Sequence, residues 1–395
     1  MSVGARAASD WVETALRERV DQGLLRTLTT RPAVGGLAGE INLAGNDYLD
    51  LARDPRVCDA AAEAARSWGA GATASRLVTG TLSLHEALEA ELAALADGES
   101  ALIFGSGYLA NLGVLSALAG RATPVFCDRL NHASLLDGVR LAGARWQRYR
   151  HGDPDHLDAL LRRNSGTADA PALVVTDSVF SMDGDIAPLA DIEVVARRHG
   201  ALLVVDEAHA LGVLGPGGAG ACAAAGVRAD VLTGGFGKAV GGYGGFAVCD
   251  DRLRQYLINH ARAFIYTTGL PPASAAAARE ALRLIHADGG TMGGRVLAVA
   301  DGLAERLRAR GFSVTAAQSP ILPVHIGDNA RAQGMAEALA ARGVTCGAMR
   351  PPTVPPGTAR LRLSVTLAHD DGELLDRAAD AFADAADACG VARTP

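Results

Sequence analysis

Short apolar runs alternate with amphipathic stretches along most of the chain. Runs such as 202–205 are nearly continuous in Leu and Val, which is typical of strands buried on both faces. The stretches between them repeat apolar residues at helical spacing, and this alternation predicts βαβ units and a mainly parallel sheet. The expected strands are 101–104, 124–127, 146–149, 172–176, 202–206 and 245–249, and the expected helices are 57–68, 83–96, 108–118, 133–142, 155–163, 188–199 and 272–287.

Both ends of the chain differ from this pattern. Residues 10–28 predict an amphipathic helix, and 41–49 predict a short strand that runs into a turn. After the glycine-rich stretch 289–294, the pattern predicts a small α+β unit. Its expected helices are 295–310, 330–342 and 371–388, and its expected strands are 312–315, 321–326 and 360–365. We therefore expect three parts: an N-terminal arm (1–45), a large α/β domain with a mostly parallel sheet (46–288) and a smaller C-terminal α+β domain (289–395).

Composition narrows the class of protein. The 395 residues are 49% hydrophobic, which supports a sizeable core, and the formal net charge of −7 argues against a nucleic-acid binder. The six cysteines form no C-x-x-C motif and no Cys/His cluster at metal-ligand spacing, so we expect reduced thiols and no metal site. No apolar run is long enough to span a bilayer, and residues 1–20 lack the apolar core of a signal peptide. We expect a cytoplasmic enzyme that does not bind membranes.

The stretch Leu232–Gly242 places Lys238 among glycines, directly after a probable strand. An amine attacks a carbonyl only when it is deprotonated, and burial lowers the pKa of a lysine toward neutrality. Taken alone, this position favours a surface lysine in a flexible loop. The strand 202–206, however, ends in Asp206, and His209 follows three positions later. Because the carboxyl ends of parallel strands meet at one crevice, the three side chains can face one ligand.

Three further strand ends carry polar residues. Gly105–Tyr108 forms a strand–turn–helix junction whose free N–H groups suit a phosphate, although such a turn is common. His132 follows a strand and begins a helix, where the simpler interpretation is a helix cap. Ser178–Asp185 also follows a strand, where the simpler interpretation is a surface loop. The strand ends that carry Lys238, Asp206, His132 and Ser178–Asp185 together favour one assembled site over four unrelated accidents.

The string Asp206–His209 reads D-E-A-H, which also occurs in nucleotide-driven helicases. Such an enzyme needs the phosphate-binding motif G-x-x-x-x-G-K-[ST]. The Gly237-Lys238 pair is followed by Ala239, and Leu232 stands where the first glycine would be. A helicase is therefore excluded.

Eight motifs in order resemble the α-oxoamine synthases, a family of fold-type-I pyridoxal-phosphate enzymes, over nearly the whole chain. The resemblance implies a fold-type-I transferase that uses pyridoxal 5′-phosphate (PLP). The motifs are 46–49, 75–81, 105–108, 131–135, 179–185, 206–209, 236–238 and 266–272.

The resemblance also implies roles for individual residues. Lys238 is expected to bind the cofactor aldehyde covalently and to act as the base, Asp206 to pair with the pyridine nitrogen, and His132 to stack on the ring. Those three and His209 form the expected catalytic set. The other expected cofactor contacts are Ser181 and His209 at the ring oxygen or phosphate side, the backbone of Gly107 and Tyr108 at the phosphate, and Thr268 at the phosphate of a neighbouring subunit. The expected substrate contacts are Arg26, Asn46, His132, Thr353 and Arg362, with Arg362 binding the amino-acid carboxylate.

The segment Arg350–Leu363 resembles the branch of the family that condenses L-alanine with pimeloyl-CoA, or its carrier-protein equivalent, in biotin biosynthesis. The expected partners are small-molecule substrates and a second copy of the chain in a homodimer with shared active sites. The alternatives are another α-oxoamine synthase with a different amino acid or acyl group, an aminotransferase on the same fold, and a non-catalytic partner subunit. Lys238 argues against the last of these.

One position departs from the family pattern. The family commonly has threonine two residues before the Gly-Lys pair, where it helps to hold the cofactor phosphate, whereas this chain has Gly235. Thr233, two positions earlier, offers another hydroxyl group for that task.

Overall fold

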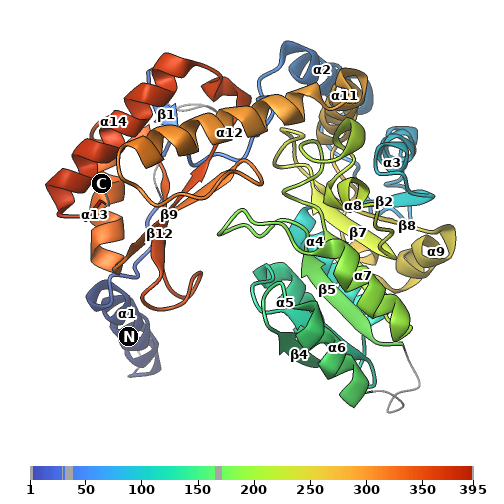
Figure 1. Ribbon diagram of the computed structural model, residues 1–395. Helices are drawn as coiled ribbons and strands as arrows, with labels where there is room; N and C mark the ends of the chain where they lie inside the picture. Colours follow the sequence, from blue (N-terminus) through green and yellow to red (C-terminus); the bar gives the residue numbers. More distant parts are fainter. Residues whose placement is uncertain (1–2, 29, 32–38, 165–170, 394–395) are drawn as a thin grey trace.

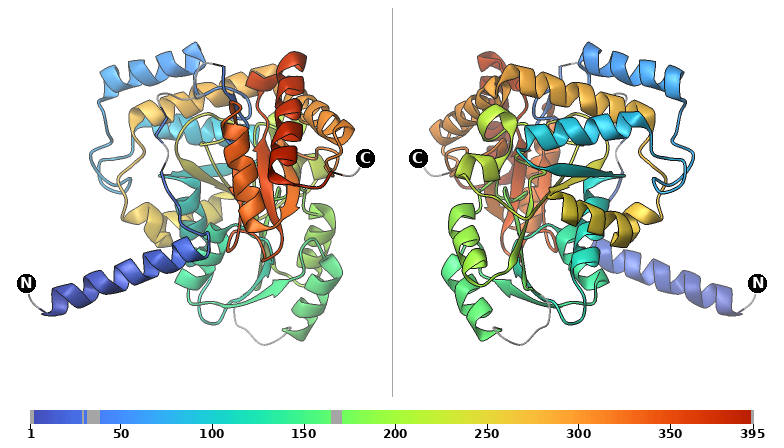
Figure 2. Two further views of the ribbon diagram at one scale, coloured as in Figure 1. Left: turned by 90° about the vertical axis from the view of Figure 1, so that its left-hand side faces the viewer. Right: turned by 90° about the vertical axis from the view of Figure 1, so that its right-hand side faces the viewer.

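The computed structural model describes residues 3–28, 30–31, 39–164 and 171–393. They form two lobes joined along one side, with the first helix standing away from both (Figures 1 and 2). No described helix combines the length and apolar character that are needed to cross a membrane.

A seven-stranded sheet forms the centre of the larger lobe, in the order β2-β8-β7-β6-β5-β3-β4. Only β8 runs antiparallel to its neighbours within this sheet, so the prediction of a mainly parallel sheet is confirmed. The short β7–β8 connection can reverse the chain but is too short for a parallel crossover. The strands are β2 Ser100–Phe104, β3 Pro124–Asp128, β4 Arg145–Tyr149, β5 Leu173–Asp177, β6 Leu202–Asp206, β7 Val231–Gly235 and β8 Gly245–Cys249.

Helices flank this sheet, and two clusters of buried apolar side chains include its strand residues. Because both faces are covered, the inner strands are almost entirely apolar; all five residues of β5 are buried. The helices of this lobe are α2 Pro55–Trp68, α3 Ser83–Leu95, α4 Gly107–Leu118, α5 Ala133–Leu141, α6 Pro154–Arg163, α7 Leu189–Arg198, α8 Ala221–Ala225, α9 Asp251–His260, α10 Arg262–Ile265 and α11 Pro272–Asp288. Helices α8, α9 and α10 were not predicted.

The smaller lobe contains the antiparallel sheet β11-β12-β9. It also contains a parallel pair in which β1, from the segment expected in the N-terminal arm, joins β10. The tripartite division at 45/46 and 288/289 stays a prediction. The elements of this lobe are β1 Ile41–Asn42, α12 Thr291–Ala309, β9 Ile321–Gly327, α13 Asn329–Ala340, β10 Val344–Thr345, β11 Gly347–Met349, β12 Ala359–Ser364 and α14 Gly372–Cys389, with a short 3₁₀ turn at Leu367–His369. A second 3₁₀ turn, Pro216–Gly218, lies in the larger lobe between β6 and α8.

Three predicted elements differ from the structure. Residues 312–315 form no strand; Phe312 and Val314 are buried as loop side chains instead. Helix α12 begins at Thr291, so part of the predicted glycine-rich boundary is helical. There a Cβ at Gly293 would lie 2.1 Å from the carbonyl oxygen of Val213, so close packing explains the glycine. Helix α1, Val3–Asp21, starts and ends earlier than predicted, and Gly23, at a φ of 64°, follows its end.

Candidate active site

A cavity of about 290 Å³ opens at the carboxyl ends of β5, β6 and β7. Of the predicted site residues, Asn46, Gly107, Tyr108, His132, Asp206, His209 and Lys238 line it. Its other lining residues are Ser106, Asn111, Ser134, Asp177, Ala208, Gly235, Gly237, Tyr243 and Gly244. A larger cavity of about 360 Å³, at the opposite ends of the strands, contains none of the predicted residues.

Lys238 lies on the short loop between β7 and β8. The loop packs tightly, since a Cβ at Gly241 would lie 2.4 Å from the backbone nitrogen of Ala52, and Gly241 has a φ of 65°. Burial lowers the pKa of Lys238, while the nearby carboxyl groups of Asp206 and Asp177 act in the opposite direction. A larger fraction of the amine is therefore deprotonated at neutral pH than in an exposed lysine, and only the deprotonated form can act as nucleophile or base. It is also the only lysine among the 395 residues.

Asp206 ends β6 and is 5% exposed. Its Oδ2 accepts a 2.6 Å hydrogen bond from Asn111 Nδ2 on α4, and its Oδ1 accepts one of 2.8 Å from the backbone N–H of Ala208. Thr233 Oγ1 donates to Asn111 Oδ1 at 2.6 Å. The hydroxyl of Thr233 is thus engaged in orienting Asn111, which in turn orients Asp206.

Asp177 was missed by the sequence analysis, although it ends β5 as Asp206 ends β6. The two residues are paired in register on adjacent strands, and Asp177 is 4% exposed. Burial first, and then the charge of Asp206, raise the pKa of Asp177 well above its ordinary value. This favours a protonated Asp177 beside Asp206. Its Oδ2 accepts a 2.8 Å hydrogen bond from the backbone N–H of His132.

His132 is both a helix cap and a residue of the cavity wall, as the two interpretations of its position predicted. It is the N-cap of α5, where its Nδ1 accepts from the Ser134 backbone N–H at 3.3 Å, and its side chain also lines the cavity. Burial lowers the pKa of His132 and thus favours the neutral imidazole. Ser134 Oγ lies 2.7 Å from His132 Nδ1 and accepts a 2.9 Å hydrogen bond from Asn111. Asn111 therefore links His132 to Asp206.

The N-terminus of α4 forms one side of the cavity. Ser106 caps this helix, with its Oγ accepting from the Leu109 backbone N–H at 3.2 Å. The β7–β8 hairpin approaches so closely that a Cβ at Gly245 would lie 2.1 Å from the Ser106 carbonyl oxygen. Gly107 and Tyr108 thus bring the unpaired first-turn N–H groups of a helix to the cavity, which suits an anion such as phosphate. The Tyr108 hydroxyl donates to Asp137 at 2.7 Å.

Arg362 lies on β12 and is 6% exposed. Its guanidinium donates to the Ser181 carbonyl, to Asn46 Oδ1 at 3.2 Å from both Nη atoms, and to Ser364 Oγ at 2.8 Å. Among the described residues, no carboxylate pairs with it. Arg360, two positions earlier and equally buried, pairs with Asp183. A buried cation without an anion is costly, so Arg362 fits an incoming carboxylate.

His151 holds the loop that carries Ser181. Its Nδ1 lies 3.0 Å from Asp128 and its Nε2 2.8 Å from Asp185. Burial alone would lower the pKa of His151, but the two carboxylates outweigh it and raise that pKa to about 10. A protonated imidazole therefore ties the loop to the end of β3.

His209 lines the cavity and also contacts Tyr48. The Tyr48 hydroxyl lies 2.7 Å from His209 Nδ1. Burial lowers the pKa of His209 well below its ordinary value, and the nearby charges of Lys238 and Arg362 act in the same direction. His209 is therefore neutral.

The other predicted residues do not line the cavity. Arg362 is one of them, although its charge acts on both His209 and Lys238. The carbonyl of Ser181 accepts from Arg362, and Thr268 is exposed and bridged to Ser75. Arg26 and Thr353 are also exposed, although the guanidinium of Arg350 bonds the carbonyl of Gly23 and so brings their two segments together. The roles of these residues, like those of the residues that line the cavity, stay predictions.

The cavity residues fit PLP. The buried amine of Lys238 matches the aldehyde of PLP, and the buried carboxyl group of Asp206 matches the pyridine nitrogen. The imidazole of His132 matches the aromatic ring, and the N-terminus of α4 matches the phosphate. The lining residues that carry these groups come from separate strand ends. Among the described residues, no group of three His, Cys, Asp or Glu is placed to hold a metal ion.

Comparisons with known proteins agree with this fit. The model of the family described as aminotransferase class I and II matches residues 38–382, so the chain belongs to this family of fold-type-I PLP enzymes. A structure of SPT with the PLP internal aldimine is 32% identical, with a TM-score of 0.91 and coverage of 98% of this chain and 99% of that one.

Within the family, the sequence is similar to proteins of one named group over most of its length. The 8-amino-7-oxononanoate synthase of Anaeromyxobacter dehalogenans (strain 2CP-1) is 48% identical over 379 residues, which cover 94% of both chains. The structure of 8-amino-7-oxononanoate synthase from Francisella tularensis is 26% identical, with a TM-score of 0.75 and coverage of 88% of this chain and 98% of that one. The chain belongs to the family of the 8-amino-7-oxononanoate synthases.

Proposed function

We propose that the chain catalyses the decarboxylative condensation of L-alanine with a pimeloyl thioester, carried by CoA or a carrier protein. The products are 8-amino-7-oxononanoate, the free thiol and CO₂, and the reaction is a step of biotin biosynthesis. Relatives of that name support this function. The observation that carries it is a buried guanidinium, Arg362, which lacks a carboxylate partner among the described residues and lies near the buried amine of Lys238.

Each cavity group has a role toward the cofactor. Lys238 would hold PLP covalently through Nζ, Asp206 would accept from the pyridine N–H, and His132 would cover the ring. The first-turn N–H groups of Gly107 and Tyr108 would bind the phosphate. When bound, PLP supplies the electron sink for the negative charge that forms at Cα of the amino acid.

The residues of the chain perform the proton transfers and the positioning. Arg362 binds the alanine carboxylate through its planar fork. Once the amino group of alanine has replaced Lys238 in the bond to the cofactor, Nζ is a free amine and would take the proton from Cα, which its lowered pKa allows. Cα then forms a bond with the thioester carbonyl carbon, the C–S bond breaks, and the thiolate leaves. The bond between Cα and the carboxylate breaks next, releasing CO₂, and Lys238 Nζ returns a proton to Cα.

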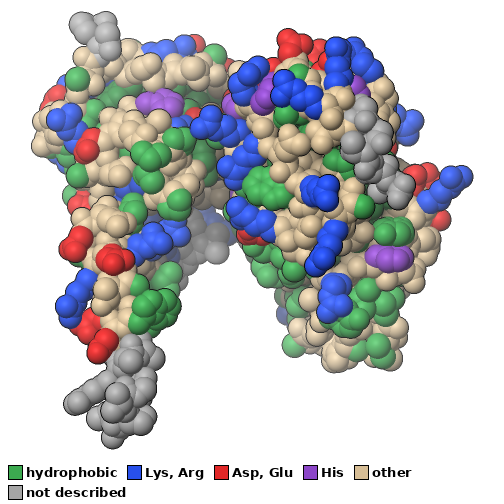
Figure 3. All heavy atoms as spheres, turned by 90° about the horizontal axis from the view of Figure 1, so that it is seen from below, with side chains coloured by type: hydrophobic (Ala, Val, Ile, Leu, Met, Phe, Trp, Pro, Cys, Tyr) green, Lys and Arg blue, Asp and Glu red, His purple; other side chains and the backbone are tan. Residues whose placement is uncertain are grey.

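The surface around the cavity suits anionic substrates. Seen from below, the molecule is hollowed between its two lobes, and basic side chains gather along the hollow (Figure 3). Because the chain has one lysine and 37 basic residues in all, these side chains are arginines apart from Lys238. Thioesters of CoA carry phosphate groups, and pimelate ends in a carboxylate, so both are attracted to this surface.

We also propose a homodimer with shared active sites in the cytoplasm. Thr268 is exposed, and near it Val78 and Tyr266 are apolar side chains that are 75% and 69% exposed. A second copy would cover these side chains and receive the Thr268 hydroxyl at its phosphate site. All six cysteines are free thiols, which suits a reducing compartment.

One alternative has support from a structure. The serine palmitoyltransferase of Sphingomonas wittichii is 35% identical with a TM-score of 0.85, which keeps a different amino acid and acyl group open. The test is thioester-dependent release of thiol, measured with alanine, glycine and serine in turn against pimeloyl-CoA and a long-chain acyl-CoA. We expect the highest kcat/KM with alanine and pimeloyl-CoA, and no release by Lys238→Ala. Faster release with serine and a long-chain thioester would favour the alternative, and amino-group transfer without thioester would indicate an aminotransferase.

A further inference from the structure

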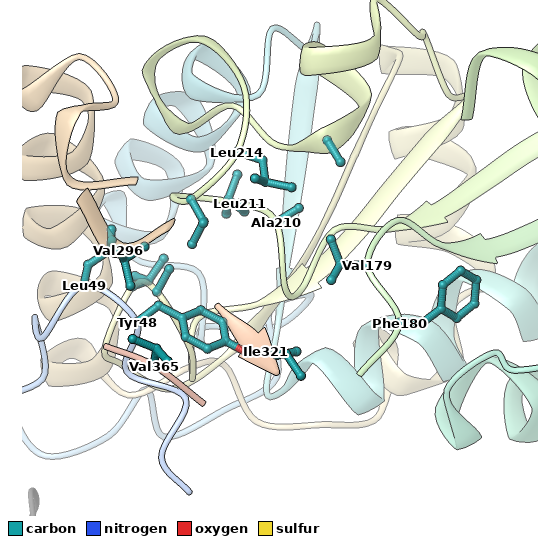
Figure 4. Close-up of a cluster of buried hydrophobic side chains, with 14 of the residues drawn as sticks. Tyr48, Leu49, Val179, Phe180, Ala210, Leu211, Leu214, Val296, Ile321 and Val365 are labelled. Atoms are coloured by element: carbon teal, nitrogen blue, oxygen red, sulfur yellow. The ribbon is translucent and has the colours of Figure 1, made fainter. Parts of the chain in front are cut away.

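The hydroxyl of Tyr48 is a buried polar group between the two lobes. The side chain is fully buried, and its ring lies among apolar side chains that include Leu49, Val296 and Val365 (Figure 4). The hydroxyl contacts His209 Nδ1 at 2.7 Å and Asn46 Oδ1 at 3.3 Å, and it also interacts with the guanidinium of Arg362. It therefore touches one residue from each of two parts of the cavity wall.

The direction of the shorter hydrogen bond follows from its surroundings. Burial raises the pKa of Tyr48 to about 12, so its hydroxyl keeps its proton at neutral pH. The alternative acceptor, Asn46 Oδ1, already receives both Nη groups of Arg362 and the Ser364 hydroxyl. The Tyr48 hydroxyl can donate to Asn46 Oδ1 at 3.3 Å, but its contact with His209 Nδ1 is shorter, at 2.7 Å. We therefore infer that the phenol proton points to His209 Nδ1, which accepts in one of the two tautomers of a neutral imidazole. A neutral imidazole that accepts at Nδ1 carries its hydrogen on Nε2.

We propose that Tyr48 is a positioning residue that donates to Nδ1 of His209 and thereby fixes the tautomer with hydrogen on Nε2. His209 then offers the cavity a hydrogen-bond donor and not an acceptor, which selects an anionic oxygen as its ligand. Without the phenol hydroxyl, both neutral tautomers become accessible, and one of them would turn a lone pair toward that oxygen. This proposal rests on the proposed function in one respect: it assumes that the ligand oxygen belongs to the cofactor or to the substrate.

Tyr48 also connects His209 to the carboxylate site. Asn46 Oδ1 is shared by Tyr48 and Arg362, so a carboxylate that draws Arg362 toward itself frees an acceptor for the phenol. Occupancy of the Arg362 site is thus expected to weaken the hydrogen bond from Tyr48 to His209 and to change the ¹⁵N shift of Nδ1, while the hydrogen stays on Nε2. A purely structural tyrosine would not produce this coupling.

The test compares Tyr48→Phe with Tyr149→Phe. Tyr149 is the matched control, because it is also fully buried but lies on the edge strand β4 outside the cavity. The two ring nitrogens of His209 are followed by ¹⁵N NMR in histidine-labelled protein without and with PLP, and the signals are assigned by their loss in His209→Gln. We expect hydrogen on Nε2 in the native protein and in Tyr149→Phe, and a mixture or a switch to Nδ1 in Tyr48→Phe.

The proposal is overturned if the native protein carries its hydrogen on Nδ1, a result that needs no variant to fold. It is equally overturned if Tyr48→Phe keeps the native tautomer. In turnover, Tyr48→Phe is expected to lower kcat by about fivefold, the effect of one hydrogen bond, with the KM for the amino acid changed less. If the native protein neither binds PLP nor turns over, the proposed function fails while the tautomer measurement still decides the role of Tyr48.

Discussion

Replacing Arg362 by lysine tests the carboxylate site most sharply, because the strand offers its own control. The substitution keeps the positive charge but removes the planar fork that reaches Asn46 and Ser364. An ammonium group on a shorter side chain can make one of the two hydrogen bonds that a guanidinium makes to a carboxylate. The loss of one hydrogen bond to a charged group costs about 1.5–3 kcal/mol. Because each loss of about 1.4 kcal/mol corresponds to a tenfold change, kcat/KM for the amino acid is expected to fall roughly tenfold to a hundredfold.

The assay is steady-state thiol release with the amino acid varied at a saturating concentration of thioester. Arg360→Lys is the control, since Arg360 lies on the same strand, is 5% exposed and already pairs with Asp183. It is expected to lower thermal stability and to leave kcat/KM for the amino acid within about threefold of the native value. The KM for the thioester should stay unchanged in both variants. The reasoning would be refuted if the two variants lost the same activity toward the amino acid, or if Arg362→Lys lost none.

Three other predictions concern residues at the proposed cofactor site and the loop beside it. Gly235→Ser is expected to lower the Kd for PLP in an absorbance titration, because it adds a hydroxyl group beside Gly107 at a position where a Cβ would meet no atom nearer than 3.4 Å. The control is Gly234→Ser, where a Cβ would lie 2.5 Å from the Phe246 ring. That variant should unfold at a lower temperature and gain no affinity for PLP. Asp177→Asn should keep kcat/KM within about threefold, since a neutral amide resembles a protonated carboxyl, whereas Asp206→Asn should lose roughly thirtyfold or more; equal losses would contradict the assignment of charge. His151→Gln should lower the free energy of unfolding most below about pH 6.5, where His151 is charged in both the folded and the unfolded state. This loss of stability should vanish as the pH rises through about 10, and it is measured by denaturant unfolding at several pH values. A loss that does not change with pH would count against the ion-paired imidazole.

The sequence predicted the part of the site that depends on topology. Asp206, His132 and Lys238 each follow a strand, and parallel strands deliver such residues to one edge whatever the details of packing. The short apolar runs predicted the strands for a similar reason, because a sheet covered on both faces requires them.

Other features depend on contacts that no local pattern records. Asp177 and Asn111 join the candidate site only through their neighbours on other elements, and no motif marks Asn111 in the sequence of its helix. Residues 312–315 form a loop, but buried Phe312 and Val314 alternate with exposed residues there, which is the pattern of a strand. The pairing of β1 with β10 joins residues about three hundred positions apart, for which the sequence carries no short-range signal.

The central claim is a covalent bond between Nζ of Lys238 and the PLP aldehyde carbon. It is tested by incubating the purified protein with PLP, reducing with sodium borohydride, and mapping the pyridoxyl group by mass spectrometry of peptides. Because Lys238 is the only lysine, the single other amine in the chain is its N-terminus, and the peptide map separates the two without ambiguity. We predict one pyridoxyl group per chain, on Lys238, and none in Lys238→Ala. A reduced protein without the adduct, or with the adduct only at the N-terminus, would contradict the account.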